Sequence, residues 1–118
     1  MAKQIKTIDY DKENDDLFIS NGDKVKASLD IGDFILDVSH DNLICGIEVM
    51  DASENLGINK DILMGIKSIK MSVAYKTNYI YVLLMISFKK GDKEVNMPIP
   101  LTLDLGHKTP RQDVLVYN

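Results

Sequence analysis

The chain has 118 residues and a mass of 13.3 kDa, a length that suits one domain with one core and is too short for two. Apolar residues make up 45% of it and charged residues 27%, which excludes a disordered chain, a fibre and a coiled coil. The single cysteine excludes an internal disulfide, and no apolar run approaches the ~18 residues of a membrane helix. We therefore expect a cytoplasmic protein with no membrane contact.

Charge is unevenly distributed along the chain, although the net charge is only −4. Residues 1–59 hold thirteen carboxylates and five lysines, whereas residues 60–118 hold nine basic residues and five carboxylates. Two interpretations stay open: each half solvates its own surface, or the acidic half attracts a basic partner or the basic half of a second copy. One arginine and a pI near 5.0 argue against nucleic acid as a partner.

Residues 5–50 read as an N-terminal β meander. Turn signals at Asn21-Gly22, Gly32-Asp33 and His40–Asn42 separate short segments in which apolar and polar residues alternate. An Asn-Gly pair favours a tight hairpin, because both residues tolerate positive φ. The segment Ile44–Met50 is apolar on both faces, which is typical of a central strand covered on both sides.

Residues 51–66 read as a helical bridge. Asp51, Ser53 and Asn59 are candidate N-caps. They predict one helical turn near Ser53–Leu56 and a short helix near Lys60–Gly65, which Gly65 limits in length.

Residues 67–104 read as a three-strand C-terminal meander. Its second strand, Tyr79–Phe88, is apolar on both faces. In the last strand Pro98 and Pro100 are two residues apart, so both missing N–H groups fall on one edge and protect it against a further strand. The tail, residues 105–118, either stays loose or docks as an extra strand.

The predicted fold is mainly β, with about seven to eight antiparallel strands in one or two meander sheets and one short helix between the meanders. The alternative class is α+β.

The most acidic stretch carries Asp9, Asp11, Glu13, Asp15 and Asp16. Its alternating oxygens are similar to a calcium loop, but an asparagine and a serine stand where that loop needs its glycine and its bidentate glutamate. We interpret the stretch as an acidic turn between two strands and as a candidate patch for steering a basic protein partner.

Three further carboxylates, Asp37, Glu48 and Asp51, lie in or beside strong strands. A pair of them would support acid–base catalysis if the fold brings them together. Solvent-facing alternation explains Asp37 and Glu48 equally well, and helix capping explains Asp51. We therefore expect a non-catalytic interaction module, with a small enzyme that uses two of these carboxylates as the alternative.

No cofactor is predicted. A zinc site would need Cys45, His40 and His107, which do not show metal-ligand spacing, and Cys45 reads as a small core residue. The outer side of the second C-terminal strand is more informative, because one short helix does not cover it. Tyrosine is enriched in interface cores. Four residues therefore predict a homodimer interface: Tyr79, Tyr81, Leu83 and Met85.

The stretch from Tyr10 to Ser53 resembles a prokaryotic family known as domain of unknown function 2283. The family pattern has a Tyr-Asp start, two short strand motifs and a Gly-Ile-Glu-Ile-x-Asp-Ala-Ser close. Here the four parts are Tyr10-Asp11, Asp16–Ile19, Ile35–Asp37 and Gly46–Ser53.

This resemblance implies a small cytoplasmic β-rich protein and no catalytic residues. Some members of the family lie beside small toxin-like proteins, which implies an antitoxin-like binding role for this chain.

Overall fold

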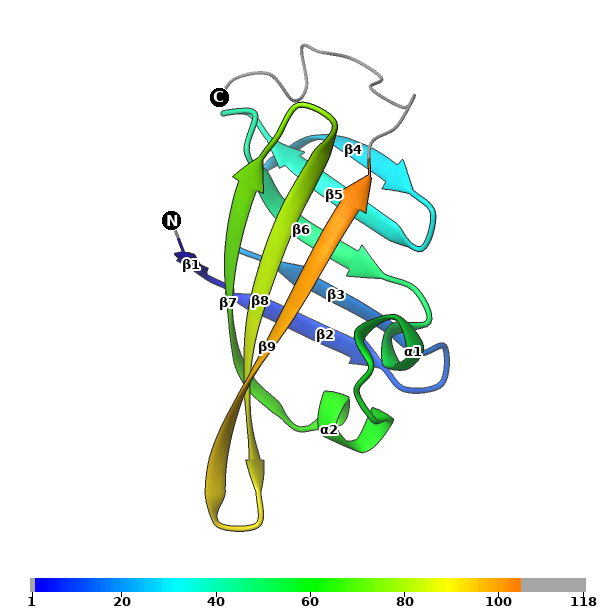
Figure 1. The fold of residues 1–118 in the computed structure, drawn as a ribbon, viewed down its shortest axis with the longest axis vertical. Coiled ribbons are helices and arrows are strands. Elements are labelled where there is room, and N and C mark those ends of the chain that lie inside the picture. The colour runs from blue at the N-terminus through cyan, green and yellow to red at the C-terminus, as the bar shows by residue number, and fades with distance from the viewer. Residues whose placement is uncertain (1, 105–118) are drawn as a thin grey trace.

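The computed structural model describes residues 2–104, and side chains from Ile5 onward (Figure 1). The expectation for the tail lies outside these residues. Within them the chain is mainly β, as the alternation predicted, and it has nine strands and two five-residue helices where seven to eight strands and one short helix were expected. The strands are β1 (Ala2–Gln4), β2 (Thr7–Asp11), β3 (Asp16–Ser20), β4 (Val25–Ile31), β5 (Phe34–Ser39), β6 (Ile44–Val49), β7 (Ile66–Tyr75), β8 (Tyr79–Lys90) and β9 (Lys93–Asp104).

The strands form two antiparallel sheets. One has five strands in the order β2-β3-β6-β5-β4, and the other has four in the order β1-β7-β8-β9. Figure 1 shows the four-stranded sheet in front of the five-stranded one, with the strands of the two sheets crossing. The β8–β9 hairpin extends past the rest of the molecule at its turn end.

The five-stranded sheet is not a simple meander. β3 pairs with β2 and β6, while β4 pairs with β5 alone, so the tight hairpin expected at Asn21-Gly22 is wrong. Strand β6 lies at the centre of the sheet, between β3 and β5, as predicted. The expectation of cover on both sides is not met, because the face of β6 that carries Glu48 points away from the core. Asn21 begins the connection from β3 to β4, and its backbone N–H donates a hydrogen bond of 2.9 Å to the carbonyl of Cys45 on β6. The result is a Greek-key order.

The two helices connect β6 to β7. Helix α1 (Ala52–Leu56) ends at Gly57, whose φ of 68° is easily reached only by a residue without Cβ. Helix α2 (Lys60–Met64) begins after Asn59, whose side-chain oxygen accepts a hydrogen bond from the Asp61 N–H at 2.7 Å. Both lie where the sequence predicts helical turns.

The core lies between the two sheets. The alternate residues of β8 that face it are all buried: Ile80, Val82, Leu84, Ile86 and Phe88. They pack in one cluster with the inward residues of the other sheet, such as Leu17, Ile19, Leu36 and Ile47. Burial of this alternate set fixes which residues of β8 remain on its outer side.

Strand β9 is the edge of its sheet, as the two prolines predict. Pro98 pairs with Met85 and Pro100 with Leu83, in a ladder that runs without a register shift from Lys93 to Asp104. The missing N–H groups therefore fall on the side away from β8, where no strand pairs among the described residues.

Candidate functional site

Carboxylates gather on the outer face of the five-stranded sheet. The strand registers align five residues in one row across that face: Asp9, Phe18, Glu48, Ile35 and Asp30. Their inward neighbours are core residues, so the row points away from the core.

The neighbouring positions extend this face. Asp37 lies over Gly46 on the next strand, because a Cβ built at Gly46 would come within 3.1 Å of an Asp37 carboxylate oxygen. The Ser28 hydroxyl donates a hydrogen bond of 2.8 Å to Asp37 from the edge strand. Asp11 and Asp16 pair where the β2–β3 hairpin closes. We call this surface the acidic face; its carboxylates are Asp9, Asp11, Asp16, Asp30, Asp37 and Glu48.

The acidic face contains one carboxyl group, that of Glu48, whose pKa is raised by its neighbours. A hydrogen bond shared with Asp16, partial burial, and the negative charges of Asp16 and Asp37 raise the pKa of Glu48 to about 6. One carboxylate oxygen of Asp16 is buried without another hydrogen-bond partner in the described structure. The nearby Asp16 thus disfavours the ionised form of Glu48, the carboxyl group at the centre of the row.

The five carboxylates of the predicted acidic patch do not all lie on the same surface. Asp9, Asp11 and Asp16 belong to the acidic face, whereas Glu13 lies in the exposed turn between β2 and β3. The backbone N–H of Asn14 donates to Asp11 at 3.1 Å and lowers the pKa of that carboxyl. The stretch is the hairpin turn that the sequence analysis favoured over a calcium loop.

Asp15 has a structural partner set of its own. Its carboxylate accepts hydrogen bonds from the Tyr10 hydroxyl at 2.6 Å and from the Ser53 hydroxyl at 2.7 Å. The backbone N–H of Ser53 donates to it as well, at 3.0 Å. Burial opposes its ionisation, but the hydrogen bonds outweigh burial and lower the pKa of Asp15. Burial, with the Asp15 hydrogen bond and charge, raises the pKa of Tyr10 to about 12. The carboxylate of Asp15 therefore has a structural role and is not part of the acidic face.

Asp51 was predicted, with Asp37 and Glu48, as one of three candidate catalytic carboxylates, but it is not one of the carboxylates of the acidic face. It precedes α1 with a φ of 49°, and its side chain makes no capping hydrogen bond, so its expected role as a cap is wrong. Asp15 takes that role from 38 residues away, through the N–H of Ser53 and, with its backbone carbonyl, the N–H of Ala52. Asp16 is not in the carboxylate set predicted for catalysis, because only the β3–β6 pairing brings it to Glu48.

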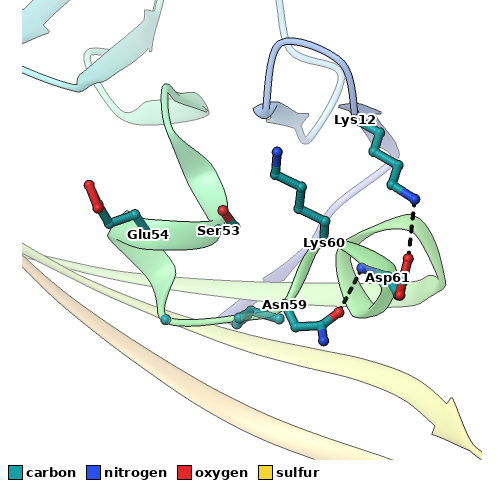
Figure 2. A pocket seen from close by; sticks show the side chains of 8 residues that line it. Lys12, Ser53, Glu54, Asn59, Lys60 and Asp61 are labelled. Atoms are coloured by element: carbon teal, nitrogen blue, oxygen red, sulfur yellow. Dashed lines mark hydrogen bonds and ion pairs between the residues drawn. The ribbon is translucent and has the colours of Figure 1, made fainter.

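A second surface feature lies beside the helices (Figure 2). This hollow, of about 650 Å³, is lined by residues from the β2–β3 turn and from the helical bridge, with the side chains of Lys12, Ser53, Asn59 and Lys60 around it. Lys12 forms an ion pair of 3.2 Å with Asp61 across its rim, where both side chains are mainly exposed. Because the lining also holds Glu54, the two lysines are matched by two carboxylates and the hollow has no net charge.

The outer face of the four-stranded sheet has a different character. Tyr79, Tyr81, Leu83 and Met85 all lie on the outer side of β8, and the two tyrosines are 38% and 36% exposed. Pro98 and Pro100 flank Met85 and Leu83 on β9. We call this surface the tyrosine face.

No metal centre is formed in the part of the chain that the structure describes. Within residues 2–104 no group of three or more histidine, cysteine or acidic side chains could hold a metal ion. His40 is exposed and Cys45 is fully buried, as expected for a core cysteine, while His107 lies outside the described residues. Neither of the two helices in these residues is long and apolar enough to cross a membrane.

These features define a small antiparallel β protein with an acidic face on one sheet and a tyrosine face on the other. The chain belongs to the DUF2283 family, described as a protein of unknown function, whose model matches residues 7–53. The matched range contains the Tyr10–Asp15–Ser53 contacts, so the start and close of the family motif meet in the fold.

Two archaeal relatives are similar to the chain. A Methanosarcina mazei protein named putative hypoxanthine phosphoribosyltransferase is 33% identical over 89 residues, which cover 75% of this chain and 72% of that protein. An uncharacterized protein of Methanocaldococcus jannaschii is 39% identical over 54 residues, covering 45% of this chain and 47% of the relative. No solved structure matches the chain.

Proposed function

We propose that this protein is a non-catalytic cytoplasmic interaction module that binds a basic segment of another protein on its acidic face. The observation that carries the proposal is the gathering of six carboxylates on one sheet face, in rows that contain no lysine or arginine. Such a field attracts a basic partner and speeds its capture. An antitoxin-like role, in which the partner is a small basic protein, is one form of this function.

The side chains between the carboxylates support binding as well as steering. Phe18 and Ile35 flank Glu48 in its row and are both partly exposed. An aromatic and an aliphatic side chain can contact the methylene stems of bound lysines or arginines, while the carboxylates pair with their charged ends.

A charge-neutralised variant tests the proposal. Asp9, Asp11 and Asp30 are exposed, and their replacement by asparagine removes three charges from the acidic face. The control replaces Glu54, Asp92 and Glu94 by their amides, which gives the same net charge with the loss outside the acidic face. The probe is an immobilised lysine-rich peptide, and the measurement is its association rate by surface plasmon resonance.

The face variant should bind the peptide more slowly than both the wild type and the control in 0.1 M salt. The difference should disappear in 1 M salt, where the Debye length is ~3 Å. Equal slowing by both variants would mean that only net charge matters, and it would contradict a dedicated face.

A catalytic role is the second candidate, because the pKa of Glu48 is raised beside Asp16 and Asp37. A carboxyl group with such a pKa can act as a general acid or base near neutral pH. The name of the Methanosarcina mazei relative gives one reaction to assay, phosphoribosyl transfer to hypoxanthine. Turnover that is lost in Glu48→Gln but kept in Glu54→Gln would favour the enzyme over the binding module.

A further inference from the structure

The tyrosine face carries projecting side chains at one end and a hollow at the other. Tyr79 and Tyr81 project at the start of β8. The hollow has a volume of about 250 Å³, smaller than the ~300–1,000 Å³ of ordinary ligand pockets. Leu83 lies halfway, because Tyr79 and Ser87 are each four residues from it along β8. The hollow is lined by Ser68, Lys70, Met85, Ser87 and Asn96.

We infer that a second copy of this chain docks on the tyrosine face. The two copies are related by a two-fold axis that lies between the two faces, runs across the strands at right angles to β8, and crosses β8 at the level of Leu83. This operation reverses the strand direction, so position 79 of one copy lies opposite position 87 of the other. Tyr79 of each copy then enters the hollow of its partner, and Tyr81 packs on Met85. The surface is thus self-complementary, as a two-fold interface requires. The inference concerns a different sheet from the acidic face and is independent of the proposed function.

The chemistry of the hollow suits a tyrosine. Ser87 and Asn96 share a hydrogen bond and both line the hollow, so hydroxyl and amide groups there can pair with an incoming phenol. The Lys70 ammonium lies in the row of Met85, within reach of the ring of a docked Tyr81. The Met85 thioether adds a sulfur–aromatic contact.

Charge does not oppose this docking. The three central rows of the face are Ala74–Tyr81–Thr102, Ser72–Leu83–Pro100 and Lys70–Met85–Pro98, and their one charged residue is Lys70. Because the axis passes through the Leu83 row, Lys70 of one copy faces the Ala74 row of the other. The two ammonium groups are therefore kept apart.

The face is large enough for a stable dimer. Three strands spaced by ~4.8 Å, over ten residues of ~3.4 Å each, cover on the order of 500 Å² in projection. Side-chain relief raises the surface removed from water to roughly 1,200 Å² for the two copies, at the lower end of specific interfaces. Pro98 and Pro100 prevent further pairing along β9, so association closes as a dimer.

Light scattering coupled to gel filtration tests the dimer with the full-length chain. At tens of micromolar the wild type should have twice the chain mass. Met85→Glu places a charge in one of the three central rows of the face and should give a monomer with an unchanged β-type circular dichroism spectrum. The matched control is Met64→Glu, because Met64 is 57% exposed at the end of α2 and is not among the residues of the tyrosine face or its hollow, and this variant should remain dimeric. A monomeric wild type would overturn the inference.

A charge-pair rescue tests the register. Tyr79→Lys and Ser87→Glu should each weaken the dimer at least tenfold, and the variant with both changes should regain at least tenfold. Positions 79 and 87 are ~27 Å apart along one strand, so they can pair only between copies. Tyr79→Lys combined with Met64→Glu has the same net charge and should not regain affinity. Failure of the double variant to regain affinity would overturn the two-fold through Leu83.

Discussion

The carboxylate of Asp15 binds the backbone N–H and the hydroxyl of Ser53, a residue 38 positions further along the chain. This contact joins the turn of the first hairpin to the start of α1. Tyr10, near the start of the matched range 7–53, donates to the same carboxylate, so one side chain connects both ends of that range.

Replacing Asp15 by alanine should lower the free energy of unfolding by about 2 to 3 kcal/mol, because hydrogen bonds to a charged group and a helix cap are lost together. Its φ of 53° adds strain for alanine. Asparagine tolerates that φ and keeps one acceptor, so Asp15→Asn should lose less. Urea denaturation of both variants measures the difference. Equal stability of wild type and Asp15→Ala would show that α1 does not need this cap.

The same carboxylate makes stability fall in acid. The pKa of Asp15 is lowered in the folded state, so its contribution is present above the ordinary carboxyl pKa and is lost as the pH falls through the folded value. Between pH 6 and pH 3 the loss should be smaller in Asp15→Asn than in the wild type, as measured by urea midpoints.

Glu48 should give the opposite pH dependence. Its folded pKa of about 6 lies above that of an unfolded chain, so the folded state holds the extra proton between the two values. Stability therefore falls as the pH rises through about 6. Glu48→Gln should be more stable than the wild type at pH 8 by about 1 kcal/mol, after solvent screening is allowed for, and near equal to it at pH 4.5. Thermal melts at the two pH values check this. A difference that does not change with pH would contradict the raised pKa of Glu48.

Gly46 should not tolerate a methyl group. A Cβ at this position would lie 3.0 Å from the backbone carbonyl oxygen of Ile19 and 3.1 Å from an oxygen of Asp37. Because the carbonyl belongs to the neighbouring strand β3, the central strands must move apart, and Gly46→Ala should cost roughly 1 to 3 kcal/mol. Gly91→Ser is a control at an open turn, where no atom lies within 4 Å of a Cβ and only the strain of a positive φ applies. Denaturant midpoints of the two variants provide the comparison.

The prolines of β9 should act against association along the strand edge. Replacing Pro98 and Pro100 by threonine, a residue with high strand propensity, introduces two N–H donors on the outer edge. The double variant should keep its fold and form species larger than the wild type, which analytical ultracentrifugation detects. If its sedimentation is unchanged, the edge is protected by something other than the missing donors.

The alternation of apolar and polar residues was enough to predict the β class, the apolar run Ile44–Met50 predicted the central position of β6, and candidate N-caps predicted helical turns where α1 and α2 lie. These features depend on contacts between residues close in the chain and on which face each residue presents. The edge position of β9 was predictable for the same reason, because Pro98 and Pro100 act through their own missing donors.

The amino-acid sequence by itself determined which residues could lie on the acidic face and on the tyrosine face, since period-two alternation fixes the side of each strand. Strand pairing between distant segments decided which of them became neighbours. The insertion of β6 between β3 and β5 brought Asp16 and Asp37 to Glu48, and the hairpin closure left Asp15 to cap α1 in place of Asp51. Local propensity cannot encode such pairings, because they depend on the burial of whole strands against a second sheet.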